Sequence, residues 1–516
     1  MSAFTENIQF DREDIEFAVP VDLPQELEEE LQRLEKSFTV DTATLKKISK
    51  RFGEELKAGL ERDADIPMNV TWVTAFPTGQ ERGTYLTIDL GGTNLRICLI
   101  TLNDEPGGSD VKQEKYPLAA EIKTGAADDL FSHIADRLGE FVKKHVKDDE
   151  AKDEEGKVPL GFTFSYPATQ HRIDHGILQT WTKGWDVDGV EGNDVADLLN
   201  KAIQKRNLPV KLVALVNDTT GALIASAYND PDTIIGAVFG TGCNAAYMER
   251  VSQIPKLKGK GTTADSDAST ATSEQSRAQK DDPLMAINCE YGAFDNSHEI
   301  LPRTRYDELI DEQSPRPGEQ TFEKMSAGLY LGEILRLILV DLRDNQLFFT
   351  SAKLTDEQNK ALETPYILDT EFLANLENDG SESLSDSKSA FQKFLADLTP
   401  SFDELRFSQA LAKLIAIRGA RLCACGASAI CSRIGTRYGH VAADGSMAVK
   451  HPRFKERWED AVREILDMRM GALGHEGIEL TNAEDGSGVG AAVICALTLG
   501  RTSSKDGGGG KVDGTH

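Results

Sequence analysis

The sequence lacks the features of several large classes of protein. Its seven cysteines are scattered over 516 residues and none forms a C-x-x-C pair, which argues against a disulfide framework or a zinc ribbon. No apolar run approaches the roughly 18 residues that span a bilayer. The first residues, MSAFTENIQFDRED, have neither the basic nor the apolar stretch of a secretory signal. We therefore expect a cytoplasmic protein without a membrane partner.

Positive charge is also scarce. The chain has 57 Lys and Arg against 85 Asp and Glu, a net charge of −28. A field of this sign repels the phosphate backbone of a nucleic acid, so no nucleic-acid partner is expected, and an anionic ligand would need positive groups placed locally. Because single domains usually end near ~250 residues, the length predicts two or three packed units. We expect a monomer or a weak homodimer.

Helical patterns open and close the chain. Leucines at helical spacing predict a helix from Pro24 to Phe38, and a second apolar face begins near Asp41. From Ala327 onward the periodicity is mostly helical, and the spacing of the cysteines between 423 and 431 is typical of helix core rather than of metal ligands. The polar segment 256–282 is expected to be a disordered insertion, and residues 503–516 a disordered tail.

Two similar glycine turns indicate an internal duplication. TIDLGGTNLRICL near residue 90 and GAVFGTGCNAAYM near residue 240 each join two apolar runs through a Gly/Thr-rich turn that ends in Asn. Strands that alternate with helices predict two α/β lobes, each presenting one turn to a common cleft. The predicted domains are N-terminal helices packing on the large domain (1–79), a small α/β domain (80–217) and a large α/β domain (218–502).

The glycine turns are candidate phosphate sites. Backbone N–H groups at such turns can approach a phosphate closely, and Thr93 and Thr241 would add hydroxyl donors. Each turn alone could equally be an ordinary β-hairpin, but two alike favour the phosphate interpretation. A third turn, Asp485–Gly490, precedes an apolar helix and is either a nucleotide site or a loop into a capped helix. The chain contains neither a P-loop nor a dinucleotide motif.

Two further segments could carry chemistry. Asp218 ends the apolar run LVALVN and starts a helix, so it is either an N-cap or, at the carboxyl end of a strand, a catalytic carboxylate. The segment WTKGW combines the Thr182 hydroxyl and the Lys183 ammonium with aromatic bulk, a mixture suited to a polyol. Its tryptophans could instead be purely structural.

The segments LGFTFSYPATQ, LQTWTKGW, VALVNDTTGALIASAY, GTGCNAAYMER and INCEYGAF occur in this order. Together they resemble the eukaryotic hexokinases, of the fungal glucokinase or hexokinase type, over roughly residues 23–500. The resemblance implies an α/β, two-lobed actin-like (ribonuclease-H-like) ATPase fold with a cleft between a small and a large domain. It also implies transfer of a phosphoryl group from ATP, with Mg²⁺, to the 6-hydroxyl of glucose or a related aldohexose, the first step of glycolysis.

The resemblance also implies roles for individual residues. Sugar contacts are implied for Ser165, Thr182, Lys183, Asn217, Asp218, Asn244, Glu290 and Glu323. Nucleotide contacts are implied for Asp89, Gly91, Gly92, Thr93, Asn94, Arg96, Lys115, Thr241, Gly242, Gly486 and Ser487. Asp218 would be the general base with Lys183 beside it, and Asp89 would hold Mg²⁺ through water. Without the resemblance, Glu290 and Glu323 would be interpreted as routine surface carboxylates.

The sequence departs from the family pattern in few places. Tyr166 and Trp185 stand where many members carry Phe, and Ala168 where many carry Cys. None of these changes removes a polar sugar contact. A non-catalytic sugar sensor and an actin-like filament or chaperone ATPase are the rival hypotheses, and the Asn217–Asp218 pair beside WTKGW favours the kinase over both. Preference among hexoses depends on pocket shape and does not follow from the sequence.

Overall fold

The computed structural model of the chain describes residues 23–105, 107–147, 151–181, 185–257, 282–350, 353–451, 453–468 and 477–506. The predicted insertion lies outside these ranges except at its two ends, and of the predicted tail only residues 503–506 lie inside them. Thr182 and Lys183 also lie outside the described residues. At the start of the insertion, Lys256 Nζ donates to the carbonyl oxygens of Gly59 and Met68 at 2.9 and 2.6 Å.

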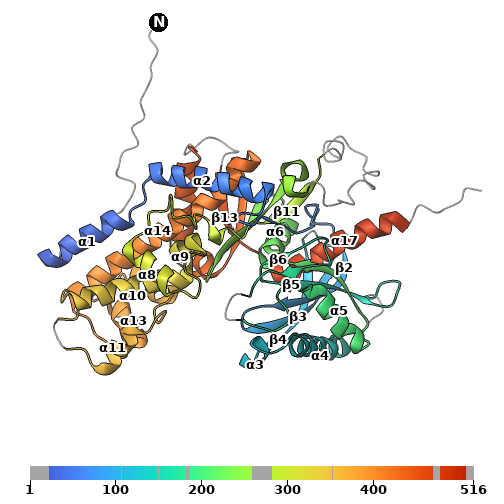
Figure 1. Ribbon diagram of the computed structural model, residues 1–516, viewed down its shortest axis with the longest axis horizontal. Coiled ribbons are helices and arrows are strands. Elements are labelled where there is room, and N and C mark those ends of the chain that lie inside the picture. The colour runs from blue at the N-terminus through green and yellow to red at the C-terminus, as the bar shows by residue number, and fades with distance from the viewer. Residues whose placement is uncertain are drawn as a thin grey trace, which may run out of the picture.

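Two mixed β-sheets form the centres of two lobes (Figure 1). The strands are β1 (Asn69–Val70), β2 (Gly83–Leu90), β3 (Asn94–Leu102), β4 (Ser109–Pro117), β5 (Val158–Phe164), β6 (Ala168–Thr169), β7 (Ile177–Leu178), β8 (Val210–Val216), β9 (Thr233–Phe239), β10 (Cys243–Arg250), β11 (Leu284–Asn288), β12 (Tyr438–Asp444) and β13 (Gly477–Asn482). The small lobe contains the sheet β4-β3-β2-β5-β8, and the large lobe contains β1-β11-β10-β9-β12-β13. Strands β6 and β7 form a separate short pair.

The two sheets repeat one topology, as the duplicated turns predict. In the small lobe β2 pairs antiparallel with β3 and parallel with β5, and β5 pairs parallel with β8. In the large lobe β9 pairs antiparallel with β10 and parallel with β12, and β12 pairs parallel with β13. The first hairpin of each sheet therefore contains one of the two glycine turns. Strands β12 and β13 lie where sequence periodicity had indicated mainly helix.

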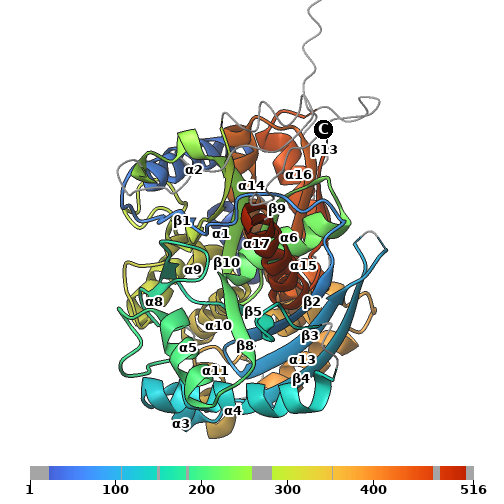
Figure 2. The ribbon, with the colours of Figure 1, turned by 90° about the vertical axis from the view of Figure 1, so that its right-hand side faces the viewer.

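Helices cover both sheets (Figure 2). They are α1 (Gln25–Phe38), α2 (Thr42–Glu61), α3 (Ala120–Lys123), α4 (Ala127–His145), α5 (Val195–Lys205), α6 (Asp218–Asn229), α8 (Arg305–Gln313), α9 (Thr321–Ser326), α10 (Gly328–Asp344), α11 (Asp356–Glu363), α12 (Thr370–Asn378), α13 (Ser385–Phe394), α14 (Phe402–Ile434), α15 (Ser446–Lys450), α16 (Phe454–Ile465) and α17 (Ala491–Asp506). The two predicted N-terminal helices are confirmed. Asp41 caps the second, accepting from the backbone N–H of Thr44 at 2.7 Å.

Helix α14 is the core of the large lobe. It is long and apolar enough to cross a membrane by length and composition, but 94% of its most apolar window is buried inside the structure. Cys423, Cys425 and Cys431 are buried in this helix, so the prediction that they form helix core is confirmed. The Cys425 Sγ approaches the carbonyl oxygen of Leu45 at 3.8 Å, which shows how closely α2 packs against α14.

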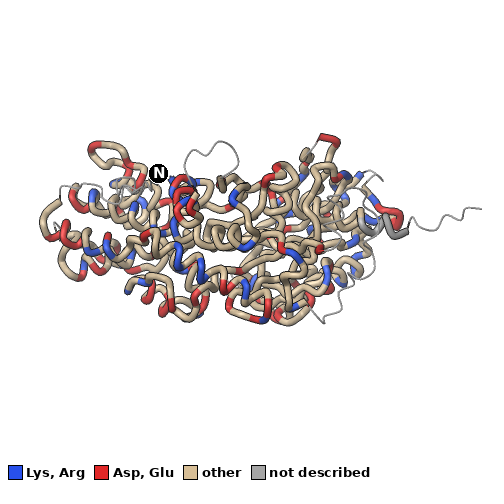
Figure 3. The backbone as a smooth tube through the Cα atoms, turned by 90° about the horizontal axis from the view of Figure 1, so that it is seen from above, with Lys and Arg blue, Asp and Glu red and all other residues tan. Residues whose placement is uncertain are grey.

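Helix α17 returns from the end of the chain to the small-lobe sheet. A Cβ on Gly161 of β5 would lie 3.1 Å from the side chains of Ala491 and Cys495, so α17 packs tightly on this strand. Helices α6 and α17 lie side by side between the sheets (Figure 2) and share an apolar core with β8. The predicted domain boundaries stay predictions. Acidic and basic residues are interspersed over both lobes (Figure 3).

Candidate functional site

Three parallel strands of the small lobe end at one edge, where the predicted polar residues gather. Asp89 lies at the end of β2, Ser165 directly follows β5, and Asn217 directly follows β8. Open α/β sheets bind ligands at the carboxyl ends of their parallel strands. In the large lobe the turn after β9 contains Thr241 and Gly242, which lie at the corresponding edge of the second sheet.

The start of α6 holds Asp218 without using it as the cap. Asn217 is the N-cap, and its Oδ1 accepts from the backbone N–H groups of Thr219 and Thr220 at 2.9 and 3.4 Å. The N-cap interpretation of Asp218 is therefore wrong, because the preceding residue fills that position. Asp218 is the first residue of the helix and its Oδ1 accepts from the Thr219 N–H at 2.8 Å. This bond fixes one carboxylate oxygen against the helix start.

A network of polar side chains links α6 to the large-lobe sheet. The Thr219 hydroxyl lies 3.2 Å from Asp218 Oδ1 and accepts from the Asn244 amide at 3.1 Å. Asn244 Nδ2 also lies 2.8 Å from Asn288 Oδ1 and 3.2 Å from Glu290 Oε1. Sequence reasoning missed Thr219 and Asn288, although both stand inside the motifs that carry the resemblance. Asn288 Nδ2 donates to Glu290 at 2.8 Å and completes the network.

The two glutamates predicted to contact sugar belong to the same region. Glu290 has a left-handed backbone (φ 55°), which is uncommon outside glycine, and its N–H donates to Asn244 Oδ1 at 2.9 Å. Glu323 Oε2 accepts from the backbone N–H of Cys243 at 3.1 Å. A Cβ on Gly242 would lie 2.6 Å from the same oxygen, so a larger residue there would displace this carboxylate. Both glutamates are half-buried, and the surface-carboxylate interpretation is wrong.

Both glycine turns close β-hairpins. The Gly91 N–H donates to the Asn94 carbonyl at 3.2 Å, and the Gly240 N–H donates to the Gly242 carbonyl at 3.0 Å. The hairpin interpretation is thus correct for the backbone geometry, and it does not exclude the phosphate interpretation. Thr93 and Thr241 both have exposed side chains, and the Thr93 hydroxyl accepts from the Asn94 amide at 2.9 Å.

Three predicted nucleotide residues form a row across the small-lobe sheet. Asp89, Arg96 and Lys115 are opposite one another in register on β2, β3 and β4, so their side chains share one face. The Arg96 guanidinium binds both carboxylate oxygens of Asp485, at 3.0 and 2.5 Å, and also the Ser487 hydroxyl. From the sequence alone, Asp485 is recognised only as the first residue of the third turn. Lys115 is exposed at the end of the row.

The electrostatics of Asp89 follow from its position in this row. Burial raises the pKa of its carboxyl above the ordinary value, and the Ser487 hydrogen bond and the Arg96 charge oppose the rise. The negative charges of Asp218 and Asp485 add to it, so Asp89 and Asp218 act on one another electrostatically. Arg96 Nε lies 3.7 Å from Asp89 Oδ2. A cation placed here would favour the ionised form of Asp89.

The third turn forms one π-helical turn, Gly486–Gly490, before α17. Asp485 caps it, accepting from the Gly488 N–H at 3.0 Å. A Cβ on Gly486 would lie 2.4 Å from the backbone nitrogen of Ala222, so this turn packs directly on the backbone of α6. The capped-helix interpretation therefore describes its geometry, and Gly486 has a packing role of its own.

The tryptophans of WTKGW are structural. Trp181 and Trp185 are buried and stacked, with ring centroids 5.3 Å apart. Trp185 Nε1 donates to the carbonyl of Gly92 at 3.3 Å, and the Tyr166 hydroxyl donates to that of Gly91 at 3.4 Å. The aromatic cluster thus holds two carbonyl groups of the first glycine turn by hydrogen bonds.

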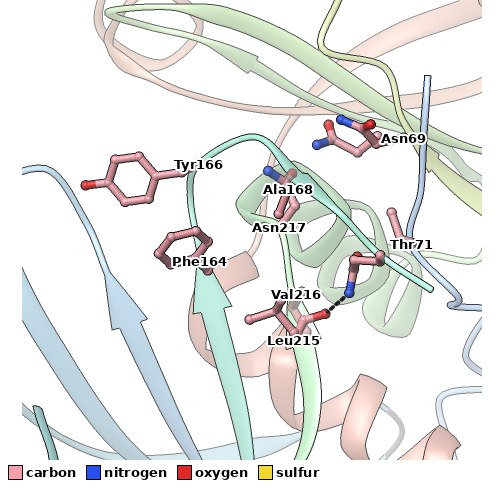
Figure 4. A pocket seen from close by; sticks show the side chains of 10 residues that line it. Asn69, Thr71, Phe164, Tyr166, Ala168, Leu215, Val216 and Asn217 are labelled. Carbon is pink, nitrogen blue, oxygen red and sulfur yellow. Dashed lines mark hydrogen bonds between the residues drawn. The ribbon is translucent and has the colours of Figure 1, made fainter. Parts of the chain in front are cut away.

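A pocket lies between the lobes beside this network (Figure 4). Asn69 of β1 faces Ala168 and Asn217 across it. Among its lining residues, the Gln170 amide donates to the Leu215 carbonyl at 3.1 Å. Its lining residues are Asn69, Thr71, Phe164, Tyr166, Ala168, Gln170, Leu215, Val216, Asn217 and Asn288. Amide groups supply most of the polar atoms that line it.

The repeated sheets and the paired glycine turns define a two-lobed α/β protein with a site between its lobes. Two family models, both described as hexokinase, match residues 30–228 and 234–497. A hexokinase of Emericella nidulans is 50% identical over 486 residues, 94% of this chain and 93% of that protein. Hexokinase-1 of Saccharomyces cerevisiae is 47% identical over 479 residues, 92% of this chain and 93% of that protein. The chain belongs to the hexokinase family.

A solved structure agrees with this assignment. The hexokinase of Schistosoma mansoni in complex with glucose matches with a TM-score of 0.77 and 33% identity, covering 92% of this chain and 99% of that one. The predicted family and the predicted two-lobed actin-like fold are confirmed. The chain is an ATP-dependent hexose kinase.

Proposed function

We propose that the chain transfers the γ-phosphoryl group of MgATP to the 6-hydroxyl of glucose or a related aldohexose, with Asp218 as the general base. The observation that carries this proposal is the network from Asp218 through Thr219 and Asn244 to Glu290, which surrounds a carboxylate with sugar-compatible donors and acceptors. The glucose bound to the Schistosoma mansoni enzyme supports the choice of sugar.

Position matters more than basicity for Asp218. A sugar hydroxyl is too weak an acid to ionise first, so the proton moves in the transition state, and the base must lie about 2.6–3.2 Å from the hydroxyl oxygen. The Thr219 N–H holds Oδ1 of Asp218 in place. The Asp218 carboxylate would accept the proton of the 6-hydroxyl, while Asn217, Asn244 and Glu290 would orient the ring.

The donor phosphates would lie between the glycine turns. Backbone N–H groups of Gly92 and Thr93 and of Thr241 and Gly242 would supply preorganised donors, and Lys183 would add a positive charge. Asp485 and Ser487 hold the Arg96 guanidinium in place. From this position it would bind phosphate oxygens or orient Asp89. Gly486 and Ser487 would border the adenosine. These donors meet the negative charge that develops during transfer.

The residues present fit a magnesium ion that comes with the nucleotide. Among the described residues no group of three or more His, Cys, Asp and Glu could enclose a metal. Mg²⁺ is usually held by one or two carboxylates together with phosphates and water, and half-buried Asp89 at the first turn suits that role through water. When bound, the ion neutralises phosphate charge.

Changing Asp89 to Asn is expected to lower kcat/KM for MgATP by about 10- to 100-fold, the usual cost of losing an outer-shell partner. Initial rates over a series of Mg²⁺ concentrations measure the effect. Asp110→Asn, on the exposed strand β4, is the control and should behave as the unchanged protein. Because burial raises the pKa of Asp89, its carboxyl becomes protonated at a higher pH than that of an ordinary aspartate. As pH falls, the wild type should therefore begin to lose activity at a higher pH than an ordinary aspartate pKa would give. Equal Mg²⁺ dependence in both variants would contradict the assignment.

Sugar-driven closure would protect ATP from water. Ser165 follows β5 of the small lobe, whereas Asn244, Glu290 and Glu323 come from the large lobe. Thr182 and Lys183 would act together with Ser165. A bound sugar bridges the two sets, so the site is complete only while sugar is present. This limits the wasteful hydrolysis of ATP by water. Scattering profiles with and without saturating glucose are expected to show a smaller radius of gyration with the sugar. An unchanged radius would count against closure.

The assay that tests the proposed function is direct. Purified protein is incubated with ATP and glucose, mannose or fructose, and the sugar 6-phosphate is measured by a coupled reaction. The proposal expects rapid formation of glucose 6-phosphate. A protein that binds glucose but forms no product would instead be a sugar sensor. ATP hydrolysis that sugar does not stimulate would favour the filament or chaperone ATPase.

We further propose that the protein works in the cytoplasm as a monomer or weak homodimer, without nucleic-acid or membrane partners. The net charge of −28 supports the absence of nucleic-acid binding. The burial of α14 inside the large lobe supports its role as a core helix. Sedimentation analysis over a range of protein concentrations tests the oligomeric state, and localisation of a fluorescent fusion tests the compartment.

A further inference from the structure

We propose that Arg316 is an interlobe latch, a positioning residue on the large lobe that holds the small-lobe segment 179–181 and thereby favours sugar binding. The inference rests on the proposed function, because this segment leads directly into Thr182 and Lys183, two of the predicted sugar contacts. Arg316 lies in the loop between α8 and α9 of the large lobe, and the segment follows β7 of the small lobe.

Two hydrogen bonds join Arg316 to the small lobe. Its Nη2 donates to the Thr180 hydroxyl at 2.7 Å and, more weakly, to the carbonyl oxygen of Trp181 at 3.4 Å. A guanidinium is well suited to this task because it is planar, always charged and rich in donors. Within the large lobe, Glu319 lies 3.5 Å from Arg316 Nη1. That pair lies within one loop, so of these Arg316 contacts the bonds to Thr180 and Trp181 are the ones that reach the small lobe.

The large-lobe side of the latch is rigid. The buried Lys324 ammonium donates to the carbonyl oxygen of Arg316 at 2.8 Å and to Asp311 Oδ1 at 2.7 Å. Gly318 N–H donates to both oxygens of Asp311 at 3.0 Å. Burial alone would raise the pKa of Asp311, but Lys324 and the Gly318 N–H outweigh it and hold that pKa below the ordinary value. The same ion pair therefore anchors the loop that presents the Arg316 side chain.

This loop also leads into the sugar site of the large lobe. Helix α9 begins at Thr321, directly after the loop, and contains both Lys324 and the predicted sugar residue Glu323. The ion pair that anchors Arg316 thus anchors the helix of Glu323. A latch built on this loop connects the sugar-binding parts of the two lobes.

The small-lobe side is also held. Trp181 is buried, its N–H donates to Glu191 at 2.6 Å, and its indole N–H donates to the Val187 carbonyl at 3.2 Å. One residue before Thr180, the Gln179 amide reaches across to Asn69 of the large lobe at 3.3 Å. Consecutive residues of the segment therefore contact the large lobe, and the lobes cannot separate here without breaking these bonds.

The exposure of Arg316 suits a contact that opens and closes. Its side chain is 47% exposed, so water can replace the lost partners when the lobes separate. Because the contact exists only while the lobes are together, it shifts the closure equilibrium toward the sugar-binding state. Removing it lowers the fraction of binding-competent protein, and apparent affinity falls by the same factor.

The test follows glucose binding without ATP through tryptophan fluorescence, to which Trp181 of the held segment contributes. The variants are Arg316→Ala, Thr180→Val and their double variant. We expect Arg316→Ala to weaken glucose binding about 3- to 10-fold, within the range for the net contribution of an ordinary hydrogen bond, because this contact is half exposed to water. The double variant should bind no more weakly than Arg316→Ala, because both changes remove the same bond. Arg316→Lys should retain part of the affinity, because the lysine ammonium can still donate to one of the two small-lobe acceptors.

Glu319→Ala is the matched control, since it removes a charged partner of Arg316 within the loop and leaves the bonds to the small lobe in place. It should bind glucose as the wild type does. Steady-state rates separate positioning from structural damage: Arg316→Ala should raise KM for glucose while kcat at saturating glucose stays within about 2-fold, since sugar in excess restores closure. Additive effects in the double variant, or wild-type affinity in Arg316→Ala, would overturn the latch.

The outcome is separable from that of the proposed function. The fluorescence titration requires no turnover, so wild-type affinity in Arg316→Ala refutes the latch even if the protein forms glucose 6-phosphate. Conversely, a wild type that forms no sugar phosphate refutes the proposed function whatever the titration of Arg316→Ala gives.

Discussion

Replacing Asp218 with Asn is expected to lower kcat by about 10²- to 10⁴-fold, the usual contribution of a general base, while glucose binding is largely retained. Asparagine keeps the shape of the side chain and an oxygen that can accept the Thr219 N–H hydrogen bond, so the start of α6 is preserved. It removes only the ability to take the proton of the 6-hydroxyl. Steady-state rates with saturating glucose and ATP measure kcat, and calorimetric titration measures glucose binding.

Two further variants sharpen this result. Asp218→Ala should lower turnover by a similar factor, since it also removes the base. Asp197→Asn, on the exposed face of α5 where its partner is Lys201, should leave turnover unchanged. If Asp218→Asn turned over at a near-normal rate, Asp218 would not be the base. If glucose binding vanished as well, the loss of rate would reflect a damaged pocket and the assignment would also fail.

Replacing Arg418 with Met is expected to remove about 3–5 kcal/mol of unfolding free energy, because it leaves a buried carboxylate without its partner. Arg418 of α14 donates to Asp307 of α8 through two bonds of 2.8 and 2.7 Å, and the two side chains are 0% and 1% exposed. Its guanidinium also lies 4.6 Å from the ring centre of Phe38 in α1. One side chain thus joins three helices of the large lobe. Urea unfolding at constant m-value measures the loss.

A surface pair provides the matched control. Lys393→Met breaks the exposed pair with Glu371 and should cost at most about 1 kcal/mol. Although burial acts to raise it, Arg418 holds the pKa of Asp307 below its ordinary value. Because the pKa of Asp307 is lowered in the folded protein, its charged form stabilises the fold at pH values above the ordinary pKa of aspartate. This contribution is lost as pH falls through the lowered pKa. Arg418→Met should therefore lack this acid-dependent loss. Equal destabilisation by the two substitutions would contradict the importance of the buried pair.

Local patterns predicted much of the fold because they depend on neighbours in the sequence. The leucines of α1 recur at helical spacing, and the two glycine turns stand between apolar runs, so both features can be recognised without tertiary contacts. Strands β12 and β13 were missed because they are short and lie among strong helices. The strand character of β12 depends on pairing with β9, more than 190 residues earlier in the chain, and β13 in turn pairs with β12.

The candidate site likewise combines features that the sequence predicts with features that only the structure shows. Asp218 was singled out because it ends an apolar run and begins a helix. That Asn217 takes the cap could be learned only from the backbone geometry of the two residues. Asp485 was named only as the start of a turn, since nothing in the sequence indicates its pairing with Arg96 across the lobes.

By itself the sequence determined the family, the two glycine turns and the carboxylate that follows the β8 run, since these are properties of short segments. Only the tertiary structure decided which side chains meet: Asn288 with Asn244 and Glu290, and Arg316 with Thr180. These contacts join residues that are adjacent only after the strands have paired and the lobes have come together. The physical reason is that a hydrogen bond or an ion pair depends on distance in space, and sequence spacing fixes that distance only within one helix, strand or turn.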